Sequence, residues 1–360
     1  MKTDIVIHAA AGLPSVSRQA GSLSEREVVS IDLKTKKVLS FVVTALALVV
    51  LFLFAVNTGS LKVTPGELFR GLFVAYDKNV ATIYDLRFPR IFIALLGGAA
   101  TAVSGVLLQA VMKNPLADPD IIGVSSGASL AAVLVTAFVP SLYFVTPLFA
   151  FLGGMLAFAL VYSLSWRGGL SPLRILLVGV TVNAMFIGLM SAFNSGTGSN
   201  YSGVASIVNA NITQKTWDDF QTLVGYVLIG LAASLLVTGQ CNLLALEDKT
   251  ARSLGVNVTR SRIVISVIAV LLASISTAVI GPISFLGLIV PHIARLLVGS
   301  NHKVLVPYAV LLGAFTLLLA DTVGRTIASP YEISAAVIMS VIGGPFFILL
   351  LRRSKQAYVG

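Results

Sequence analysis

Three arginines occupy places where the sequence predicts helix ends: Arg87 and Arg90 in the motif RFPR, and Arg325 in the motif ADTVGR. They fall on the outer side of a predicted membrane domain, where lysine and arginine are scarce. One interpretation is that they anchor helices among lipid headgroups. The other is a basic rim that receives carboxylates from an external protein, because the planar guanidinium group binds a carboxylate through two parallel hydrogen bonds. The residues alone leave both interpretations open.

A second candidate is the charged stretch LLALEDKTARSLGVNVTRSR at 243–262, the longest charged segment between predicted spans. It is too charged to lie in lipid, its composition favours a helix, and Gly255 is a natural stop. It is either a solvated connector on the inner face or a short helix that docks into a cytosolic partner. The charges do not decide between these two.

Residues 87–129 contain a third pattern. An apolar run about one bilayer thick is followed by Asn114-Pro115 and by Asp118-Pro119-Asp120, and then by a second apolar segment rich in small residues. This predicts a helical hairpin in the membrane whose helices pack closely through glycine and serine. Gln109 lies inside the first run and must face protein or water, because lipid offers its amide no partner.

Several kinds of chemistry are excluded. The sequence contains no GxxxxGK[ST] phosphate-binding loop, no HExxH and no triad-like pattern, so no catalytic residues and no ATP or Mg²⁺ site of that type are predicted on this chain. The single cysteine, Cys241, excludes a disulfide framework. His8, His292 and His302 are scattered, so we interpret His292 as structural and predict no metal site.

Composition sets the fold class. The chain has 360 residues, of which 56% are hydrophobic and 11% charged, and its mean hydropathy is +0.94. Soluble domains carry about 25% charged residues, so an all-α polytopic membrane protein is predicted. The apolar runs are too long and continuous for barrel strands. About ten spans are expected, at residues 38–56, 90–112, 121–138, 145–164, 173–193, 221–240, 262–280, 283–293, 304–320 and 334–351.

The segments outside these spans give the domains and the orientation. Residues 1–37 are expected to form a polar, poorly ordered cytosolic tail, 38–353 the transmembrane domain, and 354–360 a second cytosolic tail. With the N-terminus inside, most of the 25 lysines and arginines fall on the inner side, as the positive-inside rule requires. The net charge of +10 therefore reflects membrane orientation and not nucleic-acid binding. Residues 194–216 are expected to form an exposed outer loop.

Several long motifs stand in a familiar order and carry a resemblance. They are RFPR at 87–90, SGVLLQ at 104–109, NPLADP at 114–119, GVSSGA at 123–128, EDKTARSLG at 247–255, GPISFLGLIVPHIAR at 281–295, and the closing ADTVGR and EISAAVIMSVIGGPFFILLLRR. Over residues 38–353 the chain resembles the FecCD-type permease subunits of ABC importers for iron-siderophore complexes, haem and cobalamin.

The resemblance implies a subunit of ten helices in the bacterial cytoplasmic membrane, with both termini in the cytosol. It implies a second permease subunit, identical or related, with the translocation path between the two. Two separate ATPase subunits would hold ATP and Mg²⁺, so this chain would carry no cofactor. An extracytoplasmic substrate-binding protein or lipoprotein would deliver the ligand.

The resemblance also implies roles for single residues. Arg87, Arg90 and Arg325 match the family's positions for docking the binding protein. The segment that matches the helix inserted into the ATPase carries Glu247, Asp248, Ala251, Arg252, Leu254 and Gly255. The positions that match the inner gate are Asn114, Leu116, Ser171, Pro172 and Leu173.

One region departs from the family. Where a tryptophan-and-glycine motif is common, this chain reads ASIVNANITQKTWDDF, in which only Trp217 matches. The outer loop is therefore expected to have its own geometry.

The resemblance favours import of an iron compound, a ferric siderophore or haem, over three other functions. A cobalamin importer is the nearest alternative. A secondary transporter would carry acidic residues within its spans, whereas Asp321 and Glu332 are expected to flank an outer turn. A purely structural membrane protein would not need the outer arginines or the charged inner segment.

Overall fold

The computed structural model describes the whole chain except residues 1–15, 59–60, 166–171, 198–201, 329–330 and 357–360. The described residues form fifteen α-helices and one short 3₁₀ helix, η1. Their bounds are α1 Val16–Asn57, α2 Pro65–Phe73, α3 Lys78–Leu86, α4 Phe88–Met112, α5 Val124–Phe138, η1 Pro140–Val145, α6 Thr146–Ser165, α7 Pro172–Thr197, α8 Ser202–Val208, α9 Trp217–Leu236, α10 Thr238–Leu244, α11 Asp248–Ser253, α12 Val258–Ile280, α13 Leu286–Val298, α14 His302–Ile327 and α15 Ala335–Gln356.

These helices confirm the predicted polytopic membrane fold. Within the described residues, seven helical segments are long and apolar enough to cross a bilayer, and three shorter apolar helices accompany them. The shorter ones are α5, α13 and most of α15. Together these segments correspond to the predicted spans, because continuous apolar runs bounded by Pro, Gly and charge are a strong local signal.

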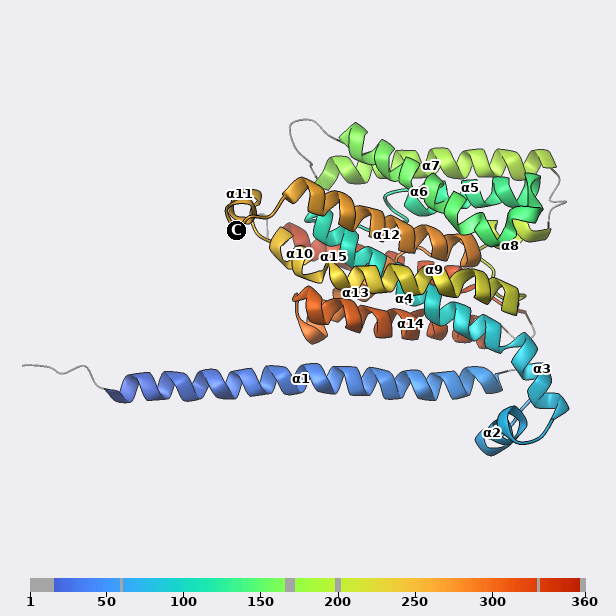
Figure 1. Ribbon diagram of the computed structural model, residues 1–360, viewed down its shortest axis with the longest axis horizontal. Coiled ribbons are helices and arrows are strands. Elements are labelled where there is room, and N and C mark those ends of the chain that lie inside the picture. The colour runs from blue at the N-terminus through green and yellow to red at the C-terminus, as the bar shows by residue number, and fades with distance from the viewer. Residues whose placement is uncertain (1–15, 59–60, 166–171, 198–201, 329–330, 357–360) are drawn as a thin grey trace, which may run out of the picture.

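The bundle has two distinct ends and two distinct flanks (Figure 1). Helix α1 runs along one flank and α7 along the opposite one, with α4, α9 and α12 between them. Helix α11 lies at one end of the bundle, and α2, α3 and α8 lie at the other. Following the predicted orientation, we call these the inner end and the outer end.

Helix α4 is the centre of the packing. Most of its residues are buried, and it packs against α9, α12, α13 and α14. Two glycines allow this: a Cβ on Gly98 would lie 2.3 Å from the carbonyl oxygen of Gly313, and one on Gly105 would lie 2.0 Å from that of Gly287. The predicted close packing through small residues is thereby confirmed for α4.

Two turns fold back against each other beside α4. The first, 113–123, leads from α4 to α5, and the second, 281–285, leads from α12 to α13. Lys113 and Phe285 adopt positive φ angles of 48° and 64° in these turns. The hydroxyl of Ser284 donates to Asp120 Oδ2 at 2.6 Å and joins the two turns. The two turns that lead into the short helices α5 and α13 are therefore held together by a hydrogen bond.

Two expectations about the segments outside the spans were wrong. Residues 16–37 are not a loose tail but continue α1, because after Pro14 the stretch contains no proline and is rich in good helix formers. The outer segment 194–216 is not simply an exposed loop. It contains α8 and buries Val204, Ile207, Ala210 and Ile212 against the bundle. Those apolar residues lie in a segment rich in Asn, Ser and Gly, a composition that is typical of a loop.

Candidate functional site

The outer arginines lie in an ion-pair cluster, here called the outer arginine cluster: Arg87, Arg90, Asp321, Arg325 and Glu332. Arg90, near the start of α4, is 5% exposed. It donates from Nη2 and Nε to Asp321 at 2.8 and 3.1 Å and from Nη1 to Glu332 at 2.9 Å. All three of its donor nitrogens therefore have acceptors within the chain.

Arg325 and Arg87 are held differently. Arg325 Nε lies 3.3 Å from Asp321 Oδ2 as an ion pair, and Arg325 Nη2 has no hydrogen-bond acceptor among the described residues. Arg87 is half-buried and donates to the backbone carbonyls of Val56 and Leu61, so it ties the end of α1 to the start of α4. Arg325 therefore has a buried donor without an acceptor among the described residues, and its side chain is only 6% exposed.

Glu332 is the exposed member of the outer arginine cluster. Its side chain is 38% exposed, and its Oε2 also accepts from the hydroxyl of Thr213 at 2.8 Å. Burial opposes ionisation, but the charge of Arg90 and hydrogen bonds from Arg90 and Thr213 outweigh it and hold the pKa of Glu332 below its usual range. The cluster therefore joins α4, α14, the 331–334 turn and the outer segment after α8.

The sequence missed these partners. Asp321 and Glu332 were expected to flank an outer turn, yet Asp321 lies within α14 and is 1% exposed. The only local sign was the i, i+4 spacing of Asp321 and Arg325 on one helix. The docking role of Arg87, Arg90 and Arg325 stays a prediction.

At the inner end, the charged segment forms the short helix α11. Ala251 is 1% exposed and faces the bundle, whereas Glu247, Lys249, Arg252, Leu254 and Gly255 are exposed. Leu254, at the helix end, is 61% exposed. Gly255 follows with a φ of 82°, a conformation that favours glycine. The face available to a partner is therefore the exposed one and excludes Ala251.

Asp248, the first residue of α11, is bound from two sides. Its Oδ1 lies 2.9 Å from Lys113 Nζ and 2.9 Å from Arg262 Nη2. The hydrogen bond from Lys113 is the main reason why the pKa of Asp248 lies below its usual range, and Arg262 adds to the effect. Lys113 also donates to the carbonyl of Leu246.

The predicted inner-gate residues fall on two elements. Asn114 is buried in the 113–123 turn, where its Oδ1 accepts from the backbone N–H of Leu116 at 2.9 Å, and Leu116 is half-buried. Pro172 begins α7 and Leu173 is 67% exposed, whereas Ser171 lies outside the described residues. Farther along α7, Gly179 packs against Ile121 of the 113–123 turn. The gate assignment stays a prediction.

Gln109 behaves as the sequence predicted. It is 3% exposed, and its Nε2 donates to the carbonyls of Ala117 and Gly287, each at 3.2 Å. It therefore joins the 113–123 turn to α13. Asp118, in the same turn, is fully buried, and its Oδ1 accepts from the N–H of Asp120 at 2.8 Å.

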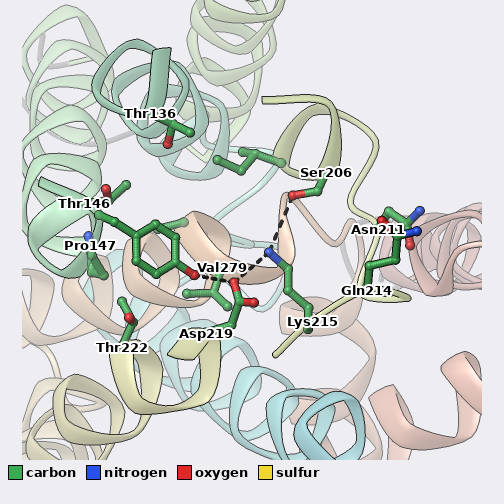
Figure 2. Close-up of a pocket in the computed structure, with 13 residues that line it drawn as sticks. Thr136, Thr146, Pro147, Ser206, Asn211, Gln214, Lys215, Asp219, Thr222 and Val279 are labelled. Atoms are coloured by element: carbon green, nitrogen blue, oxygen red, sulfur yellow. Dashed lines mark hydrogen bonds and ion pairs between the residues drawn. The ribbon is translucent and has the colours of Figure 1, made fainter. Parts of the chain in front are cut away.

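The outer half of the bundle contains a polar pocket of about 290 Å³ between α5, α6, α8, α9 and α12 (Figure 2). Asp219 is its centre: it accepts from Tyr143 and pairs with Lys215 at 3.1 Å. Lys215 Nζ also lies 3.5 Å from the hydroxyl of Ser206 on α8. This network holds the outer segment onto the bundle. It was not predicted, because Lys215 was expected in an exposed loop.

Neither histidine of the described bundle belongs to a cluster of ligands. The ring of His292 stacks edge-on against Phe346 at 5.6 Å, and His302 Nδ1 lies 2.8 Å from Asn242 Oδ1. Among the described residues, no three or more His, Cys, Asp or Glu side chains are placed to hold a metal ion.

Comparison with known proteins gives concordant results. Residues 47–353 match the FecCD transport family. The "Probable heme-iron transport system permease protein IsdF" of Staphylococcus aureus strain Newman is 39% identical over 324 residues, which is 90% of this chain and 98% of that protein. The homologue of the same name from strain bovine RF122 is equally similar, at 39% over 324 residues.

Solved structures agree. An inward-facing ABC transporter of the metal-chelate type aligns with a TM-score of 0.72 and 30% identity, covering 88% of this chain and 99% of that one. PsaBC from Streptococcus pneumoniae, in complex with Fab, aligns with a TM-score of 0.53 and 16% identity, covering 79% and 95%, and supports the fold alone. The chain therefore belongs to the FecCD transport family and is a polytopic ABC transporter permease, a transport component.

Proposed function

We propose that this permease moves an iron compound, a ferric siderophore or haem, into the cytoplasm of a bacterium. Two separate ATPase subunits supply the energy, and an extracytoplasmic binding protein or lipoprotein delivers the substrate. The observation that carries this proposal is the 39% identity to a haem-iron permease over 90% of the chain. The permease lies in the cytoplasmic membrane with both termini in the cytosol, as the distribution of lysine and arginine indicates.

The translocation path lies between this chain and a second permease, identical or related. Ligand pockets usually measure about 300–1,000 Å³, and bulky chelates need the upper part of that range. Three pockets in the described part of the chain measure about 290, 310 and 410 Å³. Helix α7 also leaves Leu173, Leu177 and Val180 exposed, and α15 leaves Val341 and Ile348 exposed. These faces suit a subunit interface or lipid better than water.

In this proposal the exposed face of α11 docks into an ATPase, and the buried Ala251 does not. Replacing Leu254 with aspartate is expected to weaken binding of the ATPase by at least about tenfold, because a large apolar anchor at an interface is replaced by a charge. The amount of ATPase that co-purifies with the permease in mild detergent measures the effect.

The matched control is Leu246→Asp, at a less exposed leucine just before α11. A Leu254→Asp permease that kept its full complement of ATPase would exclude this face as the docking surface. Bulky substitutions of Ala251 are unsuitable for this test, because they disturb the packing of α11 itself.

At the outer end, carboxylates of the binding protein pair with the outer arginine cluster, and docking uncovers Arg325, whose side chain is 6% exposed and whose Nη2 has no acceptor among the described residues. Replacing Arg325 with glutamine is expected to weaken docking. It is also expected to make the docking affinity less dependent on salt, because salt screens the charge that this substitution removes. Binding of the purified binding protein to permease in nanodiscs, at low and high ionic strength, measures both effects. Arg70→Gln, at an exposed arginine of α2, is the control. Equal affinities and salt slopes for the two variants would argue against docking at Arg325.

ATP binding closes the ATPases, moves α11 and switches the inner gate formed by Asn114 and Leu116 with Ser171, Pro172 and Leu173. A cobalamin importer with the same parts is the alternative for the substrate. An ion-coupled transporter acting alone is the alternative for the mechanism. It is less well supported, because Asp321 already has two arginine partners.

One purification tests the proposal. The permease is isolated in mild detergent from its native membrane, and all co-purifying proteins and the absorption spectrum of any bound ligand are recorded. An ATPase together with a haem- or ferric-siderophore-binding protein is the expected result. A cobalamin spectrum would correct the substrate. Recovery of this chain alone, still moving solute on an ion gradient, would overturn the importer.

A further inference from the structure

The inner end contains a side-chain bridge between the predicted ATPase-docking helix and the predicted gate turn. Lys113 is the residue at which α4 ends, and Asn114 follows it directly. Its ammonium group reaches across to the carbonyl of Leu246 and to Asp248 Oδ1, 2.9 Å away. Leu246 precedes α11 and Asp248 begins it. The bridge thus joins residues 135 positions apart in the sequence.

Asp248 is at the same time fixed to a third element. Its Oδ1 accepts from Arg262 Nη2 at 2.9 Å, and Arg262 lies early in α12. One carboxylate oxygen therefore connects α11 with the end of α4 and with α12. A carboxylate held by two cations is more closely fixed in position than one in a single pair.

Helix α11 is short. It consists of six residues and packs against α10 and α12, chiefly through the buried Ala251. Helix α11 thus packs on α10 and α12, which are its neighbours in the sequence. The side chain of Lys113 connects it to the end of α4. A displacement of α11 would reach the 113–123 turn through this contact.

Lys113, the C-cap of α4, has an uncommon backbone conformation. Its φ of 48° lies in the left-handed region, which is uncommon for a residue with a side chain. Residues in that region persist where surrounding contacts hold them, and they cluster at switch segments. The contacts of Lys113 to Leu246 and Asp248 are such contacts, and they stand directly beside Asn114.

We propose that Lys113 is a positioning residue that transmits movement of α11 to the inner gate turn, with Asp248 as its receiver and Arg262 as the fixed support. This inference rests on the proposed function, because it takes α11 as the segment moved by the ATPase. All three side chains are partly exposed, so the ion pairs add little to folding stability. Their removal therefore changes coupling and leaves the fold intact.

The test uses the permease complex purified with its ATPases and reconstituted in proteoliposomes. In Lys113→Met, uptake per ATP hydrolysed is expected to fall about tenfold, within the usual range of coupling between sites. Lys113→Arg keeps the charge and is expected to restore most of the ratio. Lys303→Met, at an exposed lysine of the inner end of α14, is the matched control. Combining Lys113→Met with Asp248→Asn should add little further loss, because both changes remove the same contact.

Hydrogen exchange on the same complexes separates this inference from the proposed function. When Mg-ATP and vanadate are added, exchange in both α11 and the 113–123 turn is expected to change in the wild type, but only that in α11 in Lys113→Met. Turn amides that respond equally in both proteins, or an unchanged coupling ratio, would overturn the bridge. A wild-type α11 that does not respond to nucleotide would overturn the docking of the ATPase at α11, and the bridge with it.

Discussion

Replacing Arg90 with alanine is expected to lower the free energy of unfolding by about 3–5 kcal/mol, the usual cost of removing one partner of a buried ion pair. Arg90 supplies three hydrogen-bond contacts to Asp321, whose side chain is 1% exposed. Without Arg90, the one ion pair that Asp321 keeps among the described residues is that with Arg325 at 3.3 Å. A buried carboxylate that has lost its main counter-charge is costly. Thermal unfolding of the purified permease in detergent measures the effect.

Two further variants isolate the ion pair. The double variant with Arg90→Ala and Asp321→Ala is expected to be more stable than Arg90→Ala alone, because it removes the stranded charge together with its partner. Arg87→Ala should cost less, because Arg87 is half-buried and loses hydrogen bonds to backbone carbonyls only. An Arg90→Ala protein that unfolds at the wild-type temperature would show that Asp321 does not depend on Arg90.

This result also bears on the docking prediction. Loss of docking in an Arg90 variant would not show that Arg90 touches the binding protein, because the same change disturbs α14 and the 331–334 turn. Arg325 Nη2 has no acceptor among the described residues, so its glutamine variant is the more informative test of docking.

The sequence predicted the spans well, for a local physical reason. An apolar run of bilayer length, such as 262–280, has few alternatives to a membrane helix, and α12 was found at Val258–Ile280. Helix α2, at Pro65–Phe73, begins at a similarly local signal, since Thr64 and Glu67 form a capping box. Such signals depend on neighbours a few residues apart.

The partners of the charged residues could not be predicted in the same way. Arg90 and Asp321 are 231 positions apart, and Lys113 and Asp248 are 135 apart. No period or composition connects such pairs, and only the packing of α4 against α14 and α10 brings them together. Sequence reasoning therefore identified the three arginines and the α11 segment as candidate functional sites. It did not identify the residues that form ion pairs with them.

The prediction of an exposed outer loop at residues 194–216 failed for a related reason. Its Asn, Ser and Gly residues are typical of an exposed loop. Yet Lys215 and Asp219 pair with each other in the pocket of Figure 2, and Ile207 and Ile212 are buried. A few apolar and paired polar residues hold such a segment down, and they are too sparse to alter its composition. The departure from the family motif near Trp217 lies in this same region.

The crossing of α4 and α13 gives the second large expected effect. Replacing Gly105 with valine should destabilise the permease by about 1–3 kcal/mol or more, the range for overpacking a filled core. Even the first added atom, Cβ, would lie 2.0 Å from the Gly287 carbonyl oxygen and 2.6 Å from its Cα. Both are backbone atoms, so no side-chain rotation relieves the clash. The helices must separate, and unfolding temperature and yield in detergent should both fall.

Gly225→Val is the matched control, because nothing lies within 4 Å of a Cβ at that position of α9. Unfolding temperatures that fell equally in both variants would indicate a general cost of valine in a helix and not a clash at Gly287. The crossing also has a specific consequence for the gate. Gly287 accepts from Gln109, which in turn holds Ala117 of the 113–123 turn. Separating α4 from α13 is therefore expected to loosen that turn as well, which faster hydrogen exchange at residues 114–118 in Gly105→Val than in Gly225→Val would show.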